Sequence, residues 1–262
     1  MPREKRQFEN GELYHITLRR IADEVLFKDI GDYFRGIFGI YEFNNSNPVI
    51  IRKRREERRQ FKNYMANIRG LTPAESAGVR PLSIKELDKR SKIVQVLSFV
   101  LMPNHLHLIL RQIVDKGISL FMQKFGSGLA AYFFERYYGK MKKKGHFFQD
   151  RFNAVHIVND RQLQVAFVYD WTNPIALIEP GWKEKGIKNP AKAKKFLEQY
   201  RWSSYLDCIG IKNFPSIIEA EKDFLMEVMG GAEGCRQAVN DWILQKGGII
   251  KIAESFKRFS FD

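Results

Sequence analysis

Alternating apolar and polar residues predict three β-strands in the first half of the chain. Residues 13–20 alternate, residues 93–101 are apolar nearly throughout, and residues 105–110 alternate again. Because strand side chains point to opposite faces with a period of two, the third strand places its histidines on one face and its leucines on the other. The short link 102–104 predicts an antiparallel hairpin between the last two strands. The apolar strand 93–101 is expected at the centre of the sheet, covered on both faces.

Apolar residues at three- and four-residue spacing predict helices over 28–43 and 115–138. A third helix is expected to begin at Asn159, a residue type that caps helices, and to stop at Pro174. Two further short strands are predicted, at 145–149 and 153–158.

The charged run 52–59 (RKRREERR) allows two interpretations. It is either the solvated face of a helix or an arm that contacts phosphates, and its two glutamates slightly favour the solvated face. A loop over 71–81 and a short helix from Ser83 to about Arg90 are expected to follow.

The composition indicates an intracellular, basic protein. The chain has 262 residues, enough for one sizeable domain with an extension, and its 44 Lys and Arg against 30 Asp and Glu give a net charge of +14. Such an excess modestly favours nucleic acid as a partner over a merely soluble basic protein. With no signal peptide or membrane segment in the sequence, we expect a cytoplasmic protein that does not enter membranes. The two cysteines, Cys208 and Cys235, are expected to be packing residues.

A possible metal site emerges when the histidine strand is combined with the third helix. His105 and His107 share one strand face, while Tyr169 and Asn173 lie one turn apart on the helix. Two imidazoles and an amide oxygen leave open positions on an ion, which suits Mg²⁺ or Mn²⁺ bound to a phosphate better than a closed zinc site. Taken alone, the two histidines are a weak signal and favour an ordinary strand over a metal site. His15 remains open as a supporting residue, a DNA contact or an ordinary polar residue.

The order of these motifs resembles a known family. MPNHLHLIL (102–110) resembles the histidine strand of the HUH single-strand DNA endonucleases, and YDWTNPI (169–175) resembles the Tyr-x-x-x-Asn-Pro segment of single-tyrosine, IS200-like transposases, in particular the REP-associated tyrosine transposases. Three weaker matches are YHITLRR, GHFFQDRF and YRWSSY. The resemblance covers about 8–210, taken as the transposase domain, and leaves 211–262 as a C-terminal extension of unknown role. The stretch 48–80 is longer than the family pattern.

The resemblance implies an α+β, ferredoxin-like (RRM-like) antiparallel sheet with packed helices and a mainly helical C-terminal extension. It implies that Tyr169 cleaves single-stranded DNA near hairpins through a 5′-phosphotyrosine intermediate and that His105, His107 and Asn173 bind the divalent metal. The protein is then expected to be bacterial, nucleoid-associated, and a monomer or homodimer. The basic residues assigned to DNA binding are Arg19, Lys140, Lys142, Lys143, Lys144 and Arg151.

Two rival functions are compatible with parts of the sequence. A non-catalytic nucleic-acid-binding module with a ferredoxin-like sheet explains the charge and the aromatic residues, but not the pairing of Tyr169 with Asn173. A zinc hydrolase would use a metal-bound water and needs no tyrosine. A phenol, with an ordinary pKa near 10, is a weak nucleophile at neutral pH, so a metal that polarises the phosphate makes chemical sense beside it.

Overall fold

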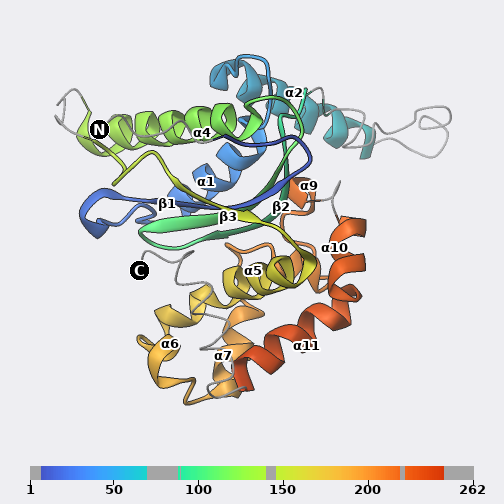
Figure 1. The fold of residues 1–262 in the computed structure, drawn as a ribbon. Coiled ribbons are helices and arrows are strands. Elements are labelled where there is room, and N and C mark those ends of the chain that lie inside the picture. The colour runs from blue at the N-terminus through green and yellow to red at the C-terminus, as the bar shows by residue number, and fades with distance from the viewer. Residues whose placement is uncertain (1–6, 70–87, 89, 140–145, 219–221, 245–262) are drawn as a thin grey trace.

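The structure, a computed structural model, describes residues 7–69, 88, 90–139, 146–218 and 222–244 (Figure 1). Its strands are β1 (Leu13–Arg19), β2 (Val94–Leu101), β3 (His105–Gln112) and β4 (Asn153–Ile157). Its longer helices are α1 (Ile30–Glu42), α2 (Ile51–Arg69), α4 (Gly117–Phe133), α5 (Asp160–Thr172), α7 (Pro190–Leu197), α10 (Lys222–Met229) and α11 (Gly231–Leu244). Its short helices and turns are η1 (Ile21–Asp23), η2 (Phe134–Tyr138), η3 (Asn173–Leu177), α6 (Trp182–Lys185), α8 (Tyr205–Cys208) and α9 (Pro215–Ile218).

The four strands form one antiparallel sheet in the order β2-β3-β1-β4. Along the chain the elements run β1, α1, β2, β3, α4, β4, with α2 inserted before β2. This is the split βαβ arrangement of the ferredoxin-like fold. The predicted fold class is therefore confirmed, as is the β2–β3 hairpin.

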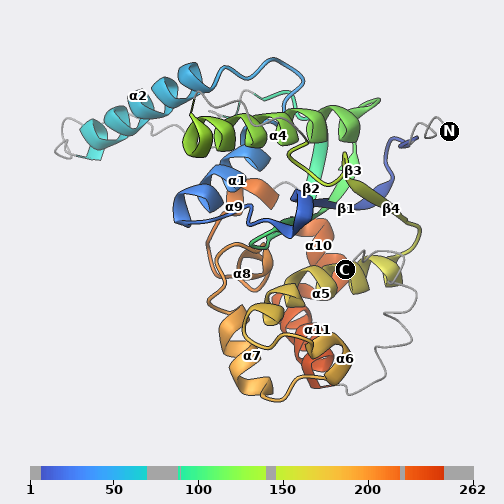
Figure 2. The same ribbon diagram turned by 90° about the vertical axis from the view of Figure 1, so that its left-hand side faces the viewer.

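The two faces of the sheet carry different layers. Figure 2 shows α1 and α4 on one side of the sheet and α5, α7 and α11 on the other. The leucines of β3 and the apolar residues of β1, such as Ile16 and Leu18, are fully buried in the hydrophobic core. The histidines of β3 have the opposite orientation in the pleat, so they point to the side that α5 covers.

The expected central position of β2 is wrong, because β2 is an edge strand. It is nonetheless buried along its length. The segment 202–204 covers its free edge: the Leu101 N–H donates to the Trp202 carbonyl at 2.8 Å and the Ser204 N–H donates to the Phe99 carbonyl at 2.9 Å. Both faces and the edge are thus shielded from water, which explains why the sequence of β2 looks like that of a central strand.

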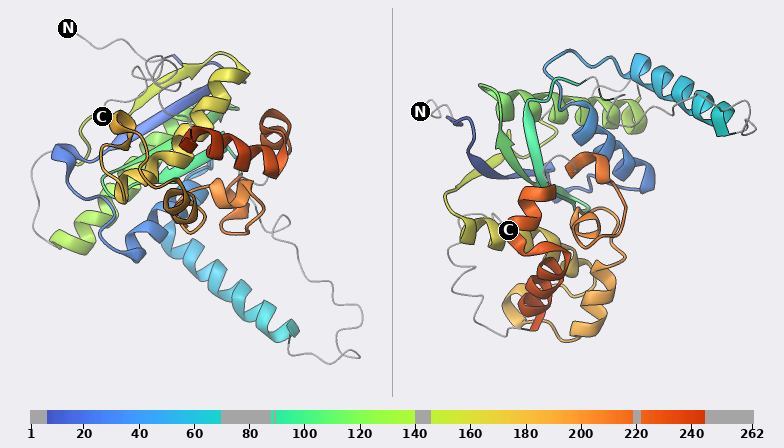
Figure 3. Two further views of the ribbon diagram at one scale, coloured as in Figure 1. Left: turned by 90° about the horizontal axis from the view of Figure 1, so that it is seen from below. Right: turned by 90° about the vertical axis from the view of Figure 1, so that its right-hand side faces the viewer.

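Helix α5 lies against one face of the sheet, over β2 and β3, in the view from below (Figure 3). Its start is fixed by Asn159, whose side chain accepts a hydrogen bond from the Gln162 N–H, as the sequence predicts. After Thr172 the chain continues directly into η3, with Pro174 in its first turn. Helices α10 and α11 pack against α5, so the C-terminal helices support the element that carries Tyr169.

Several predicted segments differ from the structure or lie outside it. Residues 146–149 form only a single bridge, between Phe148 and Arg20, instead of the predicted strand. The loop 71–81 and most of the helix expected at 83–90 lie outside the described residues. Within the described part of the chain, no helix is long and apolar enough to span a membrane.

Candidate active site

The register of the sheet groups the polar residues of β1 and β3 on one face. His107 pairs with Thr17, and His105 pairs with Arg19. His15 lies two positions from Thr17 on β1 and therefore points to the same side. The ring centroids of His105 and His107 are 4.9 Å apart, and those of His15 and His107 are 5.2 Å apart. Three imidazoles therefore meet beneath α5.

The surroundings of His107 favour a neutral imidazole ring. Its Nδ1 lies 3.1 Å from the Thr17 hydroxyl, whereas its buried Nε2 has no hydrogen-bond partner among the described residues. Burial holds the pKa of His107 well below its usual range, and the nearby His105 and His15 add to this effect. A neutral ring whose Nδ1–H donates to Thr17 keeps its lone pair on Nε2, the arrangement that metal-binding histidines use.

His105 is oriented by its neighbour in the sequence. Its Nδ1 lies 2.6 Å from the Asn104 side-chain oxygen. An amide oxygen can only accept a hydrogen bond, so Nδ1 carries the proton and Nε2 is the ring atom suited to a ligand. The contacts of both rings are thus compatible with Nε2 as the atom that binds a metal.

Tyr169 lies on the face of α5 that covers these histidines. Its ring centroid is 5.7 Å from that of His107 and 6.0 Å from that of His15. Asn173 follows one turn later, and its backbone N–H donates to the Tyr169 carbonyl. Its buried side-chain nitrogen has no hydrogen-bond partner among the described residues. The structure therefore brings Tyr169 to the histidine strand, and it buries Asn173 one turn away.

A buried hydrogen bond joins β1 to α5 beside these residues. His15 Nε2 lies 2.9 Å from Asp170 Oδ1, and the two side chains are 1% and 0% exposed. Burial raises the pKa of Asp170 above its usual range, while His15 opposes this shift. His15, His107 and Asp170 each have a ligand atom within 4.8 Å of the others, so they form a second possible metal-binding group.

Lys183 was not among the predicted site residues. It lies in a lysine-rich segment that forms α6 and α7. The Lys183 ammonium lies 3.1 Å from the Tyr169 hydroxyl and 4.7 Å from the centre of its ring. One lysine in a run of several carries no distinguishing pattern, so only the fold could identify it.

The predicted DNA-binding residues do not form a cluster that the structure describes. Arg19 forms an ion pair with Asp23 at 2.8 Å, and Arg151 is exposed. Lys140 and Lys142–Lys144 lie outside the described residues. Their role in DNA binding remains a prediction.

Residues 82–169 match the model of a family described as "Transposase IS200 like". The matched segment spans about a third of the chain, includes both histidines of β3 and ends at Tyr169, so the resemblance to the IS200-like transposases that the sequence predicts is confirmed.

One solved structure is similar to this chain. It is entitled "Structure of the REP associates tyrosine transposase bound to a REP hairpin", with 13% sequence identity and a TM-score of 0.42. The match covers 83% of this chain and 90% of the other. No curated protein matches the chain significantly.

Proposed function

We propose that the chain cleaves and rejoins single-stranded DNA through Tyr169, beside DNA hairpins. The observation that carries this proposal is the position of the Tyr169 ring, 5.7 Å from that of His107, on the face where the β3 histidines converge. The segment matched to the IS200-like transposases supports DNA strand transfer as the reaction class. A tyrosine beside two neutral imidazoles fits a nucleophile at a phosphate held by a metal ion.

The proposed reaction is a transesterification that conserves the phosphodiester bond. The Tyr169 oxygen attacks the scissile phosphorus and loses its proton, and a phosphotyrosine bond forms to the 5′ side. The bond from phosphorus to the 3′ oxygen breaks, and that oxygen takes up a proton to become a 3′-hydroxyl. Attack by a 3′-hydroxyl on the phosphotyrosine reverses the step, so rejoining needs no ATP.

Lys183 has a place in this reaction. The negative charge on the phenol oxygen grows as it loses its proton, and the Lys183 ammonium is 3.1 Å away. A positioned cation stabilises such charge, provided that it is held before the reaction begins. The fold provides this positioning because Lys183 lies in α6. This helix comes shortly after α5, the helix that carries Tyr169, with only η3 between them.

The metal ligands in this proposal are His105, His107 and Asn173, with Mg²⁺ or Mn²⁺ as the ion. A divalent ion held there would neutralise charge on the scissile phosphate. The two oriented histidine rings and the buried Asn173 amide fit this role. On this assignment the His15–Asp170 pair braces α5 against β1, while the alternative is that His15 and Asp170 bind the ion together with His107.

The remaining expectations are part of the same proposal. We infer a division into a transposase domain, 8–210, and a C-terminal extension, 211–262. DNA with single-stranded and hairpin parts is the proposed partner, with the protein as a monomer or homodimer.

The test is covalent capture of labelled hairpin DNA. The protein and end-labelled DNA with single-stranded flanks are incubated with Mg²⁺ and then denatured, so that only covalent adducts migrate with the protein. We expect an adduct with the wild type and with Tyr138→Phe, a control outside the site, but none with Tyr169→Phe. Absence of an adduct over a range of hairpins would contradict the proposal and favour a non-catalytic binding module.

A further inference from the structure

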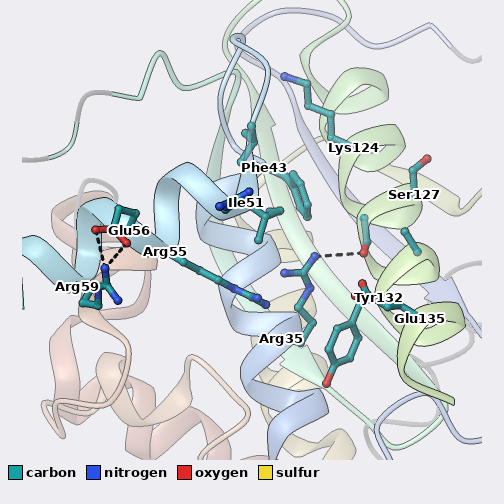
Figure 4. Close-up of a pocket in the computed structure, with 14 residues that line it drawn as sticks. Arg35, Phe43, Ile51, Arg55, Glu56, Arg59, Lys124, Ser127, Tyr132 and Glu135 are labelled. Carbon is teal, nitrogen blue, oxygen red and sulfur yellow. Dashed lines mark hydrogen bonds and ion pairs between the residues drawn. The ribbon is translucent and has the colours of Figure 1, made fainter. Parts of the chain in front are cut away.

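A basic groove lies between α2 and α4 (Figure 4). Its volume is about 800 Å³, and its walls come from α1, α2 and α4. Helices α1 and α4 cover the other face of the sheet from α5, so this groove is separate from the candidate active site (Figure 2). Helix α2 carries the charged run 52–59.

The first turns of α2 are anchored to the body of the protein. Arg54 donates to Glu42 at 2.7 Å, and this Glu42 carboxylate at the end of α1 is only 1% exposed. Ile51 also packs against the hydrophobic core. A buried carboxylate that lost its arginine would be left without its charge partner, so this contact holds α2 firmly in orientation. The start of the groove wall that α2 forms is therefore tied to α1 and the core.

The anchored helix turns a row of arginines into the groove. Arg52, Arg55 and Arg59 all line it, at the three- and four-residue spacing of one helix face. Arg54 is on another face, where it binds Glu42. Figure 4 shows Arg55 extending from α2 towards Arg35 of α1.

The charges of the groove are only partly neutralised. Its lining has five cationic residues and two acidic ones, Glu56 and Glu135. Glu56 pairs with Arg59 at 2.8 Å. The Lys124 ammonium binds the backbone carbonyls of residues 45–47 at 2.5 to 3.1 Å, which explains its role without a ligand.

Three guanidinium groups remain without a carboxylate partner among the described residues, those of Arg35, Arg52 and Arg55. Arg35 is half-buried, donates to the Gly128 carbonyl at 3.3 Å and lies 5.2 Å from the centre of the Tyr132 ring. Burial and the nearby positive charge of Arg55 both lower the pKa of Arg35, although Glu135 opposes them. Like charges held this close favour an anion between them.

We propose that this groove binds the phosphate backbone of DNA, away from the scissile phosphate. Arginine forks match phosphate oxygens in pairs, which favours phosphate as the anion. Arg52 and Arg59 are separated along α2 by about 10 Å of helix rise. That length corresponds to about three phosphates along one strand of a duplex. The inference rests on the proposed function, which makes DNA the polyanion that the protein meets.

The test compares two doubly substituted proteins with the same loss of charge. Arg52→Gln/Arg55→Gln removes two unpaired charges of the groove, and Lys53→Gln/Lys192→Gln removes two exposed charges that do not line it. Circular dichroism verifies that both proteins fold. Binding of a fluorescent DNA hairpin, and of a single strand of equal length, is measured by anisotropy over about 50 to about 200 mM NaCl.

We expect the groove variant to lose about two phosphate contacts on one of the two DNAs. If the hairpin occupies the groove, the steepness of log K against log salt falls by about 1.8 for the hairpin, so its affinity loss over that salt range becomes about 12-fold smaller. If the single strand occupies the groove, the steepness falls by about 1.4 for the single strand. The DNA that shows the change identifies duplex or single strand as the occupant. The slope of the control should differ from the wild-type slope by no more than the loss of about half a phosphate contact would cause.

Equal slopes for the groove variant and the control, on both DNAs, would overturn the proposal. Unchanged slopes together with weaker binding of polyglutamate by the groove variant would also overturn the proposal, because the groove would then bind an acidic protein. Covalent adduct formation at saturating DNA separates this inference from the proposed function. The groove variant should keep that rate, whereas Tyr169→Phe should lose the adduct and keep the salt slope.

Discussion

Replacement of Lys183 by methionine tests whether the fold activates Tyr169. Methionine keeps much of the side-chain volume but removes the ammonium that lies 3.1 Å from the phenol oxygen. The prediction is that Lys183→Met slows adduct formation without weakening DNA binding. The reason is that the charge on the phenol oxygen develops only during the reaction.

The size of the effect follows from the contact. A hydrogen bond to a charged group contributes about 1.5 to 3 kcal/mol. The bare Coulomb energy at this distance is about 5 kcal/mol in a medium of effective dielectric constant about 20, and it is an upper bound because Lys183 is partly exposed. A loss of about 2 kcal/mol corresponds to an adduct-formation rate about 30-fold slower.

The assay is single-turnover adduct formation at saturating DNA and Mg²⁺, with DNA affinity measured separately. Lys185→Met is the matched control, because it removes an exposed lysine of the same short helix α6. Lys183→Arg should retain part of the rate, since it keeps the charge. The reasoning is refuted if Lys183→Met reacts within about threefold of the control, or if its whole defect is in DNA affinity.

Three further predictions concern the metal, the packing and the cysteines. His107→Ala and Asn173→Ala should each abolish Mn²⁺ binding, measured by electron paramagnetic resonance, and should largely spare DNA affinity. Loss of Mn²⁺ binding in Asp170→Asn but not in Asn173→Ala would assign the ion to the alternative ligands His15, His107 and Asp170. Gly128→Ala should lower the free energy of unfolding in urea by about 1 to 3 kcal/mol, because its Cβ would lie 2.3 Å from the Phe43 ring. Gly126→Ala is its control and should be neutral or stabilising, since the nearest atom is 3.5 Å away; equal effects would refute the packing argument. Burial raises the pKa of the Cys235 thiol to about 11, so iodoacetamide at about pH 8 should label it only after unfolding, and rapid labelling of the native protein would contradict this.

Local patterns were sufficient to predict most of the fold. The alternation in β1 and β3 and the Asn159 cap of α5 are set by residues close in sequence, and the structure has them as predicted. The position of β2 could not be predicted, because its edge is covered by residues 202–204, about a hundred positions later. An edge strand covered in this way has the same buried, apolar sequence as a central one.

The candidate site could be predicted only where a motif marks it. His105, His107 and Tyr169 lie in recognisable patterns, and the fold brings them together. Asp170 lies about 100° around the helix from Tyr169, so the helical spacing does not group it with Tyr169 and Asn173. Its partner His15 lies 155 positions away, on a strand that only the sheet register places beneath α5. Lys183 likewise depends on how α6 folds back on α5, which no local pattern encodes.

The most direct test of the central proposal is to locate the covalent bond to DNA. The wild-type adduct is digested with protease and nuclease, and the modified peptide is sequenced by mass spectrometry. The proposal predicts a phosphate from the 5′ side of the cleaved DNA on the oxygen of Tyr169, and a free 3′-hydroxyl on the released strand. A nucleotide attached to any other residue, or a phosphate left on the 3′ end, would contradict it.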